Sequence, residues 1–317
     1  MRRRFSAALI LPVLAAILAL VVAGCGGTAG GTGGGAGGGA GGGAGGRLQI
    51  VAAESFWGSI ASQLAGNRGT VHSVIVDPAQ DPHSYEPVPA DARALASAQF
   101  VIVNGIGYDT WAQRLLSANP APGRVELDVG RLLGLTAGDN PHRWYSPADV
   151  EAVANAITLR LEQLQPKYGA HFRQRRAAFE STGLAGYHAA INGIRARYAG
   201  VPVGASESIF ALLAPSLGLR LLTPPSFMKA ITEGTDVSAQ DTIQTQQQIT
   251  AHQIKVWVYN AQNATPQIQR LNALARAQGI PVATITETLS PASATFQQWQ
   301  VAELTQLRRA LAQATGR

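Results

Sequence analysis

The stretch LQIVAA at residues 48–53 decides the fold, because six mostly apolar residues are followed at once by a helical pattern at 57–64. Short apolar runs that alternate with helices are typical of parallel βα units, whose strands are buried on both faces. The alternation continues with expected strands at 71–76, 100–104 and 125–128 and an expected helix at 91–98. These segments predict a first α/β lobe.

The same alternation restarts after residue 200. Expected strands lie at 201–205, 255–259 and 282–285, and expected helices follow them at 209–217, 266–278 and 296–314. We therefore predict an α/β protein with two parallel-sheet lobes.

A long helical region separates these two sets of strands. Apolar residues keep helical spacing over 150–164, and Pro147 and Asp149 provide a start signal. A second long helix is expected to connect the lobes. Gly183 and Gly186 predict a kink in it, since each costs up to about 1 kcal/mol relative to alanine. The expected boundaries are 47–168 for the N-terminal lobe, 169–199 for the connecting helix and 200–317 for the C-terminal lobe.

The amino end has the pattern of a secretory signal. Three arginines at 2–4 precede an uncharged apolar run over 7–23, which predicts a signal peptide at 1–24. The run ends in VVAG before Cys25, the single cysteine of the chain, and this resembles a bacterial lipobox with Cys25 as the lipidated residue. An uncleaved transmembrane anchor is the weaker alternative, because the run is near the lower limit for spanning a bilayer.

A glycine-rich segment completes the expected tether at 25–46. It contains only glycine, alanine and threonine after Cys25, so it cannot bury enough apolar surface to fold. Its root-mean-square reach is about 25 Å, enough to hold a domain just off a membrane to which the lipid anchors it. The formal charge of +6 falls to +3 when the three arginines leave, and no basic cluster remains to suggest nucleic-acid binding.

Two proline-flanked histidine motifs carry the chemistry. DPHSYEP at 81–87 and NPHRWYSP at 140–147 each place a histidine directly after a proline, on a stiff backbone. Histidine is the commonest protein ligand for transition metals. The alternative for either motif alone is a surface turn.

Four candidate metal ligands follow expected strands, at the carboxyl ends where open α/β sheets bind ligands. They are His83, His142, Glu207 and Glu287, two from each lobe. Two neutral imidazoles and two carboxylates would neutralise a divalent cation, so that the occupied site can be desolvated. Tyr85, Asn104 and Trp144 are candidates for a second layer around the ligands, with packing as the alternative for Trp144. Glu54 is either a cleft residue or an ordinary loop carboxylate.

Several segments of the exported part resemble the metal-binding solute receptors of bacterial ABC importers, the zinc- and manganese-capturing ZnuA/TroA-like family. The matching segments are VAAESFW at 51–57, the histidine motifs at 81–87 and 140–147, NGIGY at 104–108, ASESIF at 205–210 and TET at 286–288. The resemblance implies two lobes joined by a long rigid helix, with the metal in the interlobe cleft. It also implies His83, His142, Glu207 and Glu287 as the first to fourth ligands, although the fourth is commonly Asp. We expect a monomer, anchored outside the cytoplasm by its lipid, that delivers the ion to a membrane permease.

The metal and two alternative functions stay open at this point. Zinc accepts nitrogen and carboxylate oxygen in four-coordinate sites, whereas bidentate carboxylates would suit manganese. The missing histidine-rich loop and the Glu at 207 favour manganese slightly. A metallohydrolase with Glu287 as general base is one alternative, but it needs an open coordination position for water, and we expect no enzyme. A surface adhesin that keeps a metal for stability is the other.

Overall fold

A computed structural model describes residues 46–80 and 82–317. The predicted signal peptide, Cys25 and the tether up to residue 45 lie outside the described residues, as does Asp81. In the part of the chain that the structure describes, no helix is both long and apolar enough to cross a membrane.

The first lobe is built on a parallel sheet with the strand order β2-β1-β3-β4. Its strands are β1 (Leu48–Glu54), β2 (Gly69–Ile75), β3 (Phe100–Val103) and β4 (Val125–Asp128). Its helices are α1 (Ser55–Ala65), α2 (Pro89–Ser97), α3 (Thr110–Ala118), α4 (Val129–Leu133) and α5 (Pro147–Leu164).

Both faces of this sheet are covered, as the apolar strands predict. Side chains alternate across β1, so Ile50 and Ala52 join the core that contains α1 and α5, while Val51 and Ala53 join a second core with α2 and α3. The central strand is therefore buried on both faces, and its carboxyl end is held rigidly.

The second lobe repeats the plan with the strand order β6-β5-β7-β8. Its strands are β5 (Pro202–Ala205), β6 (Arg220–Leu221), β7 (Val256–Asn260) and β8 (Val282–Ile285). Its helices are α8 (Pro225–Thr232), α9 (Ala239–Thr250), α10 (Pro266–Ala277) and α11 (Phe296–Thr315). The predicted fold class of two parallel-sheet α/β lobes is confirmed.

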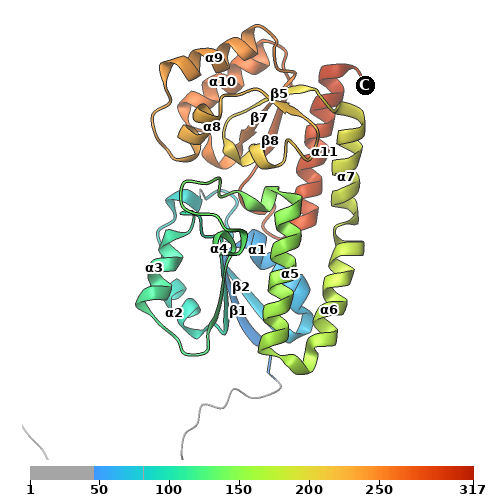
Figure 1. The fold of residues 1–317 in the computed structure, drawn as a ribbon. Helices are drawn as coiled ribbons and strands as arrows, with labels where there is room; N and C mark the ends of the chain where they lie inside the picture. The colour runs from blue at the N-terminus through green and yellow to red at the C-terminus, as the bar shows by residue number, and fades with distance from the viewer. Residues whose placement is uncertain (1–45, 81) are drawn as a thin grey trace, which may run out of the picture. The chain divides into compact units, whose positions relative to one another are not determined.

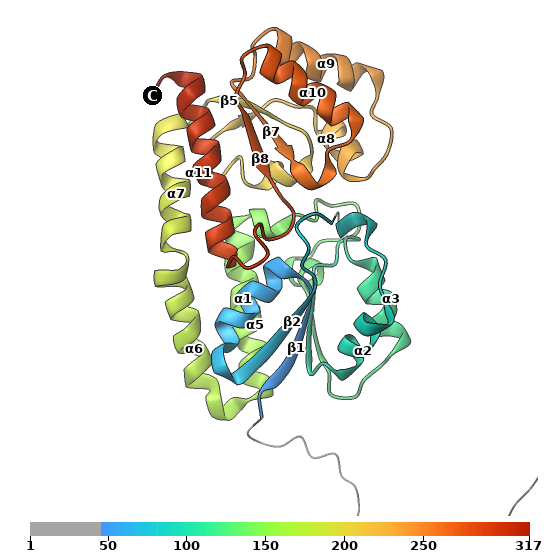
Figure 2. The ribbon, with the colours of Figure 1, turned by 180° about the vertical axis from the view of Figure 1, so that it is seen from behind.

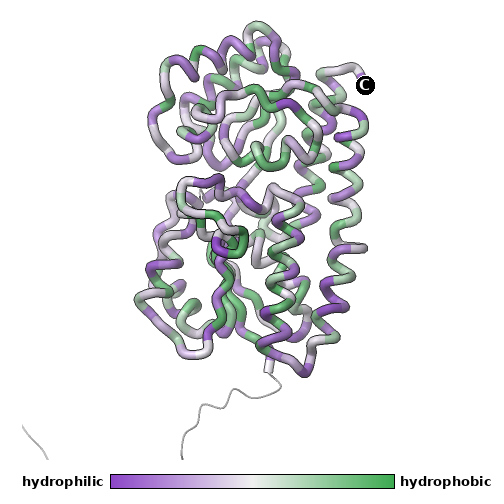
Figure 3. Tube along the Cα trace, in the orientation of Figure 1, coloured by the Kyte–Doolittle hydropathy of each residue, from purple (hydrophilic) through white to green (hydrophobic). Residues whose placement is uncertain are grey.

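The connection between the lobes is helical but divided. It consists of α6 (Gly169–Ala178), a π-helical segment (Phe179–Gly183) and α7 (Ala185–Tyr198). A π-helical turn is a recognised cause of helix bending, and it occurs where Gly183 predicted a kink. The connection runs alongside both lobes, with α6 against α1 and α5 and α7 against α11 (Figures 1 and 2). Hydrophobic and hydrophilic residues alternate along these outer helices, as expected of helices with one buried side (Figure 3).

Close packing of β5 gives a test of this fold. A Cβ atom added at Gly204 would lie 2.8 Å from both Ile254 Cδ1 and Trp257 Cε3. We expect Gly204→Ala to lower the free energy of unfolding by about 1–3 kcal/mol, measured by urea denaturation, because the overpacked core must shift. Gly193→Ala is the control: its Cβ would meet no atom within 4 Å, so the helical propensity of alanine should stabilise α7 by up to about 1 kcal/mol. A Gly204→Ala protein as stable as the parent would contradict the packing described.

Candidate metal site

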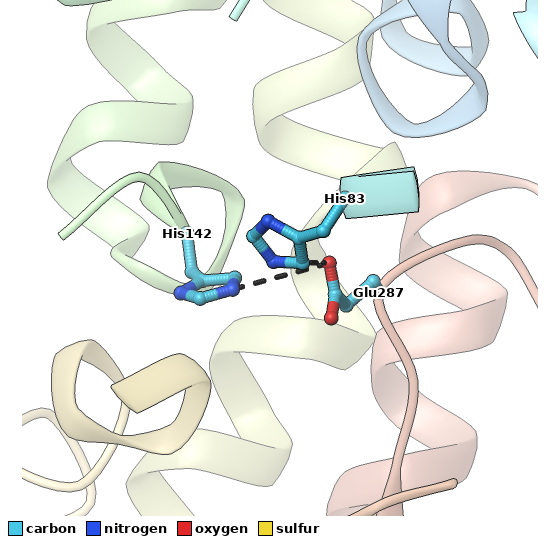
Figure 4. A group of neighbouring side chains, drawn as sticks. All are labelled: His83, His142 and Glu287. Atoms are coloured by element: carbon cyan, nitrogen blue, oxygen red, sulfur yellow. Dashed lines mark ion pairs between the residues drawn. The ribbon is translucent and has the colours of Figure 1, made fainter. Parts of the chain in front are cut away.

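Three of the four predicted ligands converge between the lobes. His83 lies in a short 3₁₀ turn (Pro82–Ser84) after β2, and His142 directly precedes another (Arg143–Tyr145). Glu287 follows β8 of the second lobe by two residues. Parallel strands end at one edge of their sheet, and here the loops from these edges bring the three side chains together (Figure 4).

One oxygen of the Glu287 carboxylate lies close to both histidines. Glu287 Oε2 lies 3.3 Å from His83 Nε2 and 4.0 Å from His142 Nε2. One ligand atom from each of the three residues lies within 4.8 Å of the others. Two imidazole nitrogens and a carboxylate oxygen at this spacing are a suitable donor set for a transition metal.

The hydrogen bonding of His142 leaves its Nε2 lone pair directed at the group. Its Nδ1 is 2.8 Å from Asn140 Oδ1, a contact that places the ring proton on Nδ1 and leaves the lone pair on Nε2. Nε2 is buried and has no hydrogen-bond partner among the described residues. Burial lowers the pKa of His142 to about 3, against the opposing effect of the Glu287 charge, so the ring is neutral at physiological pH.

Glu287 is held by three polar groups. Its Oε2 accepts a hydrogen bond from Tyr108 Oη at 2.6 Å, its Oε1 accepts one from Asn260 Nδ2 at 2.7 Å, and its backbone N–H donates to Gln262 Oε1 at 2.6 Å. Burial alone would raise the pKa of Glu287, but His83, His142 and Tyr108 outweigh it and lower the pKa to about 2. The carboxylate is therefore charged in spite of complete burial.

Glu207 lies beside this group and is not part of it. Its Oε1 accepts from Asn260 Nδ2 at 2.7 Å and its Oε2 from Asn263 Nδ2 at 2.8 Å. Asn260 thus bridges Glu207 and Glu287. Burial and the charge of Glu287 raise the pKa of Glu207 to about 8, so this carboxyl favours its protonated form near neutral pH.

The sequence prediction missed Tyr108, Asn260 and Gln262, which position Glu287. Gln262 also donates through Nε2 to Gln80 O at 2.7 Å, and so connects the loop before His83 with the backbone of Glu287. Asn260 ends β7, one of the two inner strands of the second sheet, and its position at a carboxyl strand end was the available signal.

The three residues proposed to surround the ligands have different positions. Asn104 accepts a hydrogen bond through Oδ1 from Trp57 Nε1 and donates one through Nδ2 to the backbone oxygen of Pro141, both at 3.0 Å. Pro141 directly precedes His142, so Asn104 supports the backbone next to this histidine. Trp144 is buried with its ring 5.3 Å from that of His142 and stacked on Phe56.

Tyr85 lies away from the group. Its hydroxyl donates to Asp91 Oδ2 at 2.7 Å, and its ring centroid is 4.9 Å from that of Trp111. The 3₁₀ turn ends at Ser84, so the chain directs Tyr85 toward the core under α2 and α3 instead of toward His83.

Glu54 is neither a cleft residue nor a loop carboxylate. It is the last residue of β1, is completely buried and lies next to Asp109. Asp109 accepts the backbone N–H groups of Asn104 and Gly105 at 2.6 and 2.9 Å. Burial raises the pKa of Glu54 well above its ordinary value and that of Asp109 to about 6. This carboxyl pair fixes the loop that carries Tyr108.

A second group of possible ligands lies on the helices. Glu151, Glu180 and His188 bring one ligand atom each within 4.8 Å of the others. Arg176 Nη1 is 3.0 Å from Glu180 Oε2, so an internal cation already occupies that carboxylate. The first group, by contrast, adjoins a cavity of about 690 Å³ that residues of both lobes line, among them His83, Tyr108 and Asn263.

Two curated relatives match this chain over less than half of their own length. The manganese-binding lipoprotein MntA of Halalkalibacterium halodurans is 34% identical over 122 residues, which are 38% of this chain and 40% of MntA. The manganese ABC transporter substrate-binding lipoprotein PsaA of Streptococcus pneumoniae is 27% identical over 146 residues, or 42% of this chain and 47% of PsaA.

The fold itself recurs in solved structures. The Mn-bound periplasmic metal-binding protein of Candidatus Liberibacter asiaticus, solved as a point mutant, aligns with a TM-score of 0.70 at 19% identity. The alignment covers 83% of this chain and 98% of that protein. A family model described as "ZnuA: Zinc-uptake complex component A periplasmic" matches residues 50–310, almost the whole described part. The chain therefore belongs to the ZnuA family, as the resemblance in its sequence predicted.

Proposed function

We propose that this protein captures a divalent transition metal, zinc or manganese, outside the cytoplasm and delivers it to the permease of an ABC importer. The observation that carries the proposal is the buried, unpartnered Nε2 of His142, which lies 4.0 Å from Glu287 Oε2 of the opposite lobe. Buried polar atoms without a partner are rare in proteins, and a metal ion would supply the missing interaction. Family membership and the names of the manganese-binding relatives support the same function.

In this proposal His83, His142 and Glu287 bind the ion directly and Glu207 is the fourth ligand. Glu207 must then lose its proton and turn one oxygen away from an asparagine, because both of its oxygens accept amide hydrogen bonds in the structure. The complete set would neutralise a dication and so allow it to be buried.

Capture suits the site better than catalysis. Three of the proposed ligands, His142, Glu207 and Glu287, are completely buried, and the polar atoms around them hold the carboxylates in place. A hydrolase with Glu287 as base needs that residue free to accept a proton from water, whereas both of its oxygens already accept hydrogen bonds, from Tyr108 and Asn260. Loss of esterase or peptidase activity in Glu287→Gln with metal retained is the result that would favour the enzyme.

The location is part of the proposal. The signal peptide at 1–24, lipidation at Cys25 and the tether at 25–46 would anchor the lobes and their connecting helix, 47–168, 169–199 and 200–317, as a monomer outside the membrane. A Cys25→Ala protein that is still processed and membrane-bound would contradict the lipid anchor. An adhesin role would need a surface partner in addition to the metal.

Metal titration tests the central claim. At zinc or manganese concentrations about 1,000 times the Kd, linkage predicts about 4 kcal/mol of added stability, seen as a large rise in Tm of the metal-stripped protein. His83→Ala should lose this rise, whereas His72→Ala, at an exposed position of β2, should keep it. A parent protein whose Tm does not respond to either metal would refute the proposed function.

A further inference from the structure

The two oxygens of Glu287 are held by donors from opposite lobes. Tyr108, on the loop after β3, donates to Oε2, and Asn260, at the end of β7, donates to Oε1. Oε2 is also the atom nearest to both histidines. The carboxylate therefore presents one oxygen to the histidines and keeps the other on the asparagine.

Tyr108 cannot easily follow a rotation of this carboxylate. It is almost completely buried, and its ring packs 4.8 Å from that of His83 and 5.2 Å from that of Trp144. Its backbone is fixed as well, since Asp109 accepts two N–H groups of the preceding turn. Gly105 and Gly107 have φ values of +71° and +83°, which other residues rarely adopt.

Asn260 restrains both carboxylates at once. Its Nδ2 donates to Glu207 Oε1 and to Glu287 Oε1, each at 2.7 Å. Turning Glu287 so that both oxygens face one ion would therefore disrupt the bond from Asn260 to Oε1 and the bond from Tyr108 Oη to Oε2, both of which are buried and made to a charged group. Loss of such a bond costs about 10- to 100-fold in an equilibrium constant.

Zinc and manganese differ in what they require here. Zinc is satisfied by four ligands, with one oxygen from each carboxylate. Manganese prefers an octahedral, oxygen-rich shell, which this ligand set supplies only if carboxylates bind with both oxygens or waters enter. The restraints on the carboxylates disfavour binding through both oxygens.

We propose that Tyr108 is a specificity-determining residue: its hydroxyl keeps Glu287 bound through a single oxygen, and the site thereby selects zinc over manganese. This rests on the proposed function, since it concerns the metal that the same ligands bind. Tyr108 acts through Glu287 and does not itself touch the ion.

The test compares Tyr108→Phe with Tyr85→Phe in the full chain. Both changes remove a phenol hydroxyl that donates to a carboxylate, but the Tyr85 bond to Asp91 lies away from the group. The Kd values for zinc and manganese are measured by competition with a chromophoric chelator. We expect the ratio Kd(Mn)/Kd(Zn) to fall at least about 10-fold in Tyr108→Phe and to stay at the parent value in Tyr85→Phe.

Bound Co²⁺ gives a second measurement that reports coordination directly. Four-coordinate Co²⁺ absorbs visible light strongly and six-coordinate Co²⁺ weakly, so the intense bands of the parent should weaken in Tyr108→Phe. A Tyr108→Phe protein with tight binding but an unchanged metal ratio and cobalt spectrum would overturn the proposal and leave the proposed function intact. A parent that binds neither metal would instead overturn the proposed function.

If Tyr108→Phe does not fold, Asn260→Ala tests the same restraint on Glu287, because Asn260 holds the other carboxylate oxygen, Oε1. It frees Glu287 Oε1, and the metal ratio should again fall. An unchanged ratio in Asn260→Ala would refute the restraint on Glu287.

Discussion

Replacing Glu287 by alanine should weaken zinc binding by more than about 100-fold, above the range of about 10–100-fold seen for partners outside the ligand shell. The change removes the oxygen that lies nearest to both histidines and one of the two carboxylates that would neutralise the ion. Chelator competition and the zinc-induced rise in Tm measure the loss.

Glu162→Ala is the matched control for this variant. Glu162 pairs with Arg173 on the surface of the helices, so its removal takes away a carboxylate far from the histidines. Binding by Glu287→Ala within about threefold of Glu162→Ala, a difference of less than about 1 kcal/mol, would show that Glu287 is not a ligand.

Asp109→Ala should be the most destabilising change near the site, lowering the free energy of unfolding by about 3 kcal/mol or more. Asp109 is completely buried and accepts the backbone N–H groups of Asn104 and Gly105, which would lose their partner. Urea denaturation measures the effect. Metal affinity should fall in parallel, because the same loop carries Tyr108. A loss below about 1 kcal/mol would mean that water or another group replaces the carboxylate.

Glu54→Gln tests the pH dependence of the same pair. Burial raises the pKa of Glu54 well above its ordinary value, so the folded state keeps a proton that the unfolded state releases above about pH 4. The stabilisation that protonated Glu54 contributes is therefore fully present at low pH. It is lost as the pH rises toward the pKa of Glu54 in the folded state. We expect urea midpoints above about pH 4 to fall more steeply with rising pH in the parent than in Glu54→Gln. Equal slopes in the two proteins would contradict the buried, protonated state of Glu54.

The sequence predicted the repeated strand–helix units and the histidine motifs correctly. Apolar runs such as 48–53 and 282–285 are strands in the structure, and the proline-histidine motifs lie between the lobes with Glu287. These features depend on local pattern and on the rule that ligands bind at carboxyl strand ends.

Other features depend on contacts between distant segments, and the local sequence does not specify those contacts. Tyr108 resembles any buried aromatic until Glu287, 179 residues later, is placed against it. Asn260 becomes important only because it contacts two carboxylates from different loops. The sequence left Glu54 open as a cleft residue or a loop carboxylate. Both alternatives are wrong, because β1 continues one residue beyond its apolar run and buries this side chain.

The preference inferred for zinc also differs from the slight sequence preference for manganese. That preference came from residue types, namely a glutamate at 207 and no histidine-rich loop. The hydrogen-bond donors to each oxygen decide whether a carboxylate can bind a metal ion through one oxygen or through both. These donors come from distant parts of the chain and are seen only in the structure.

The two lobes are joined at more than one place, and this limits how far they can separate. Besides the chain through α7, the start of α11 is tied to α1, with Phe296 N–H donating to Ser59 Oγ at 2.9 Å and the amides of Gln63 and Gln297 in mutual contact. Wide hinge opening would break these ties. If the proposed function holds, release of a bound ion should therefore proceed through rearrangement of the histidine loops while the helical frame stays in place. Restraining the histidine loops should slow release of the metal ion more than restraining the helices does.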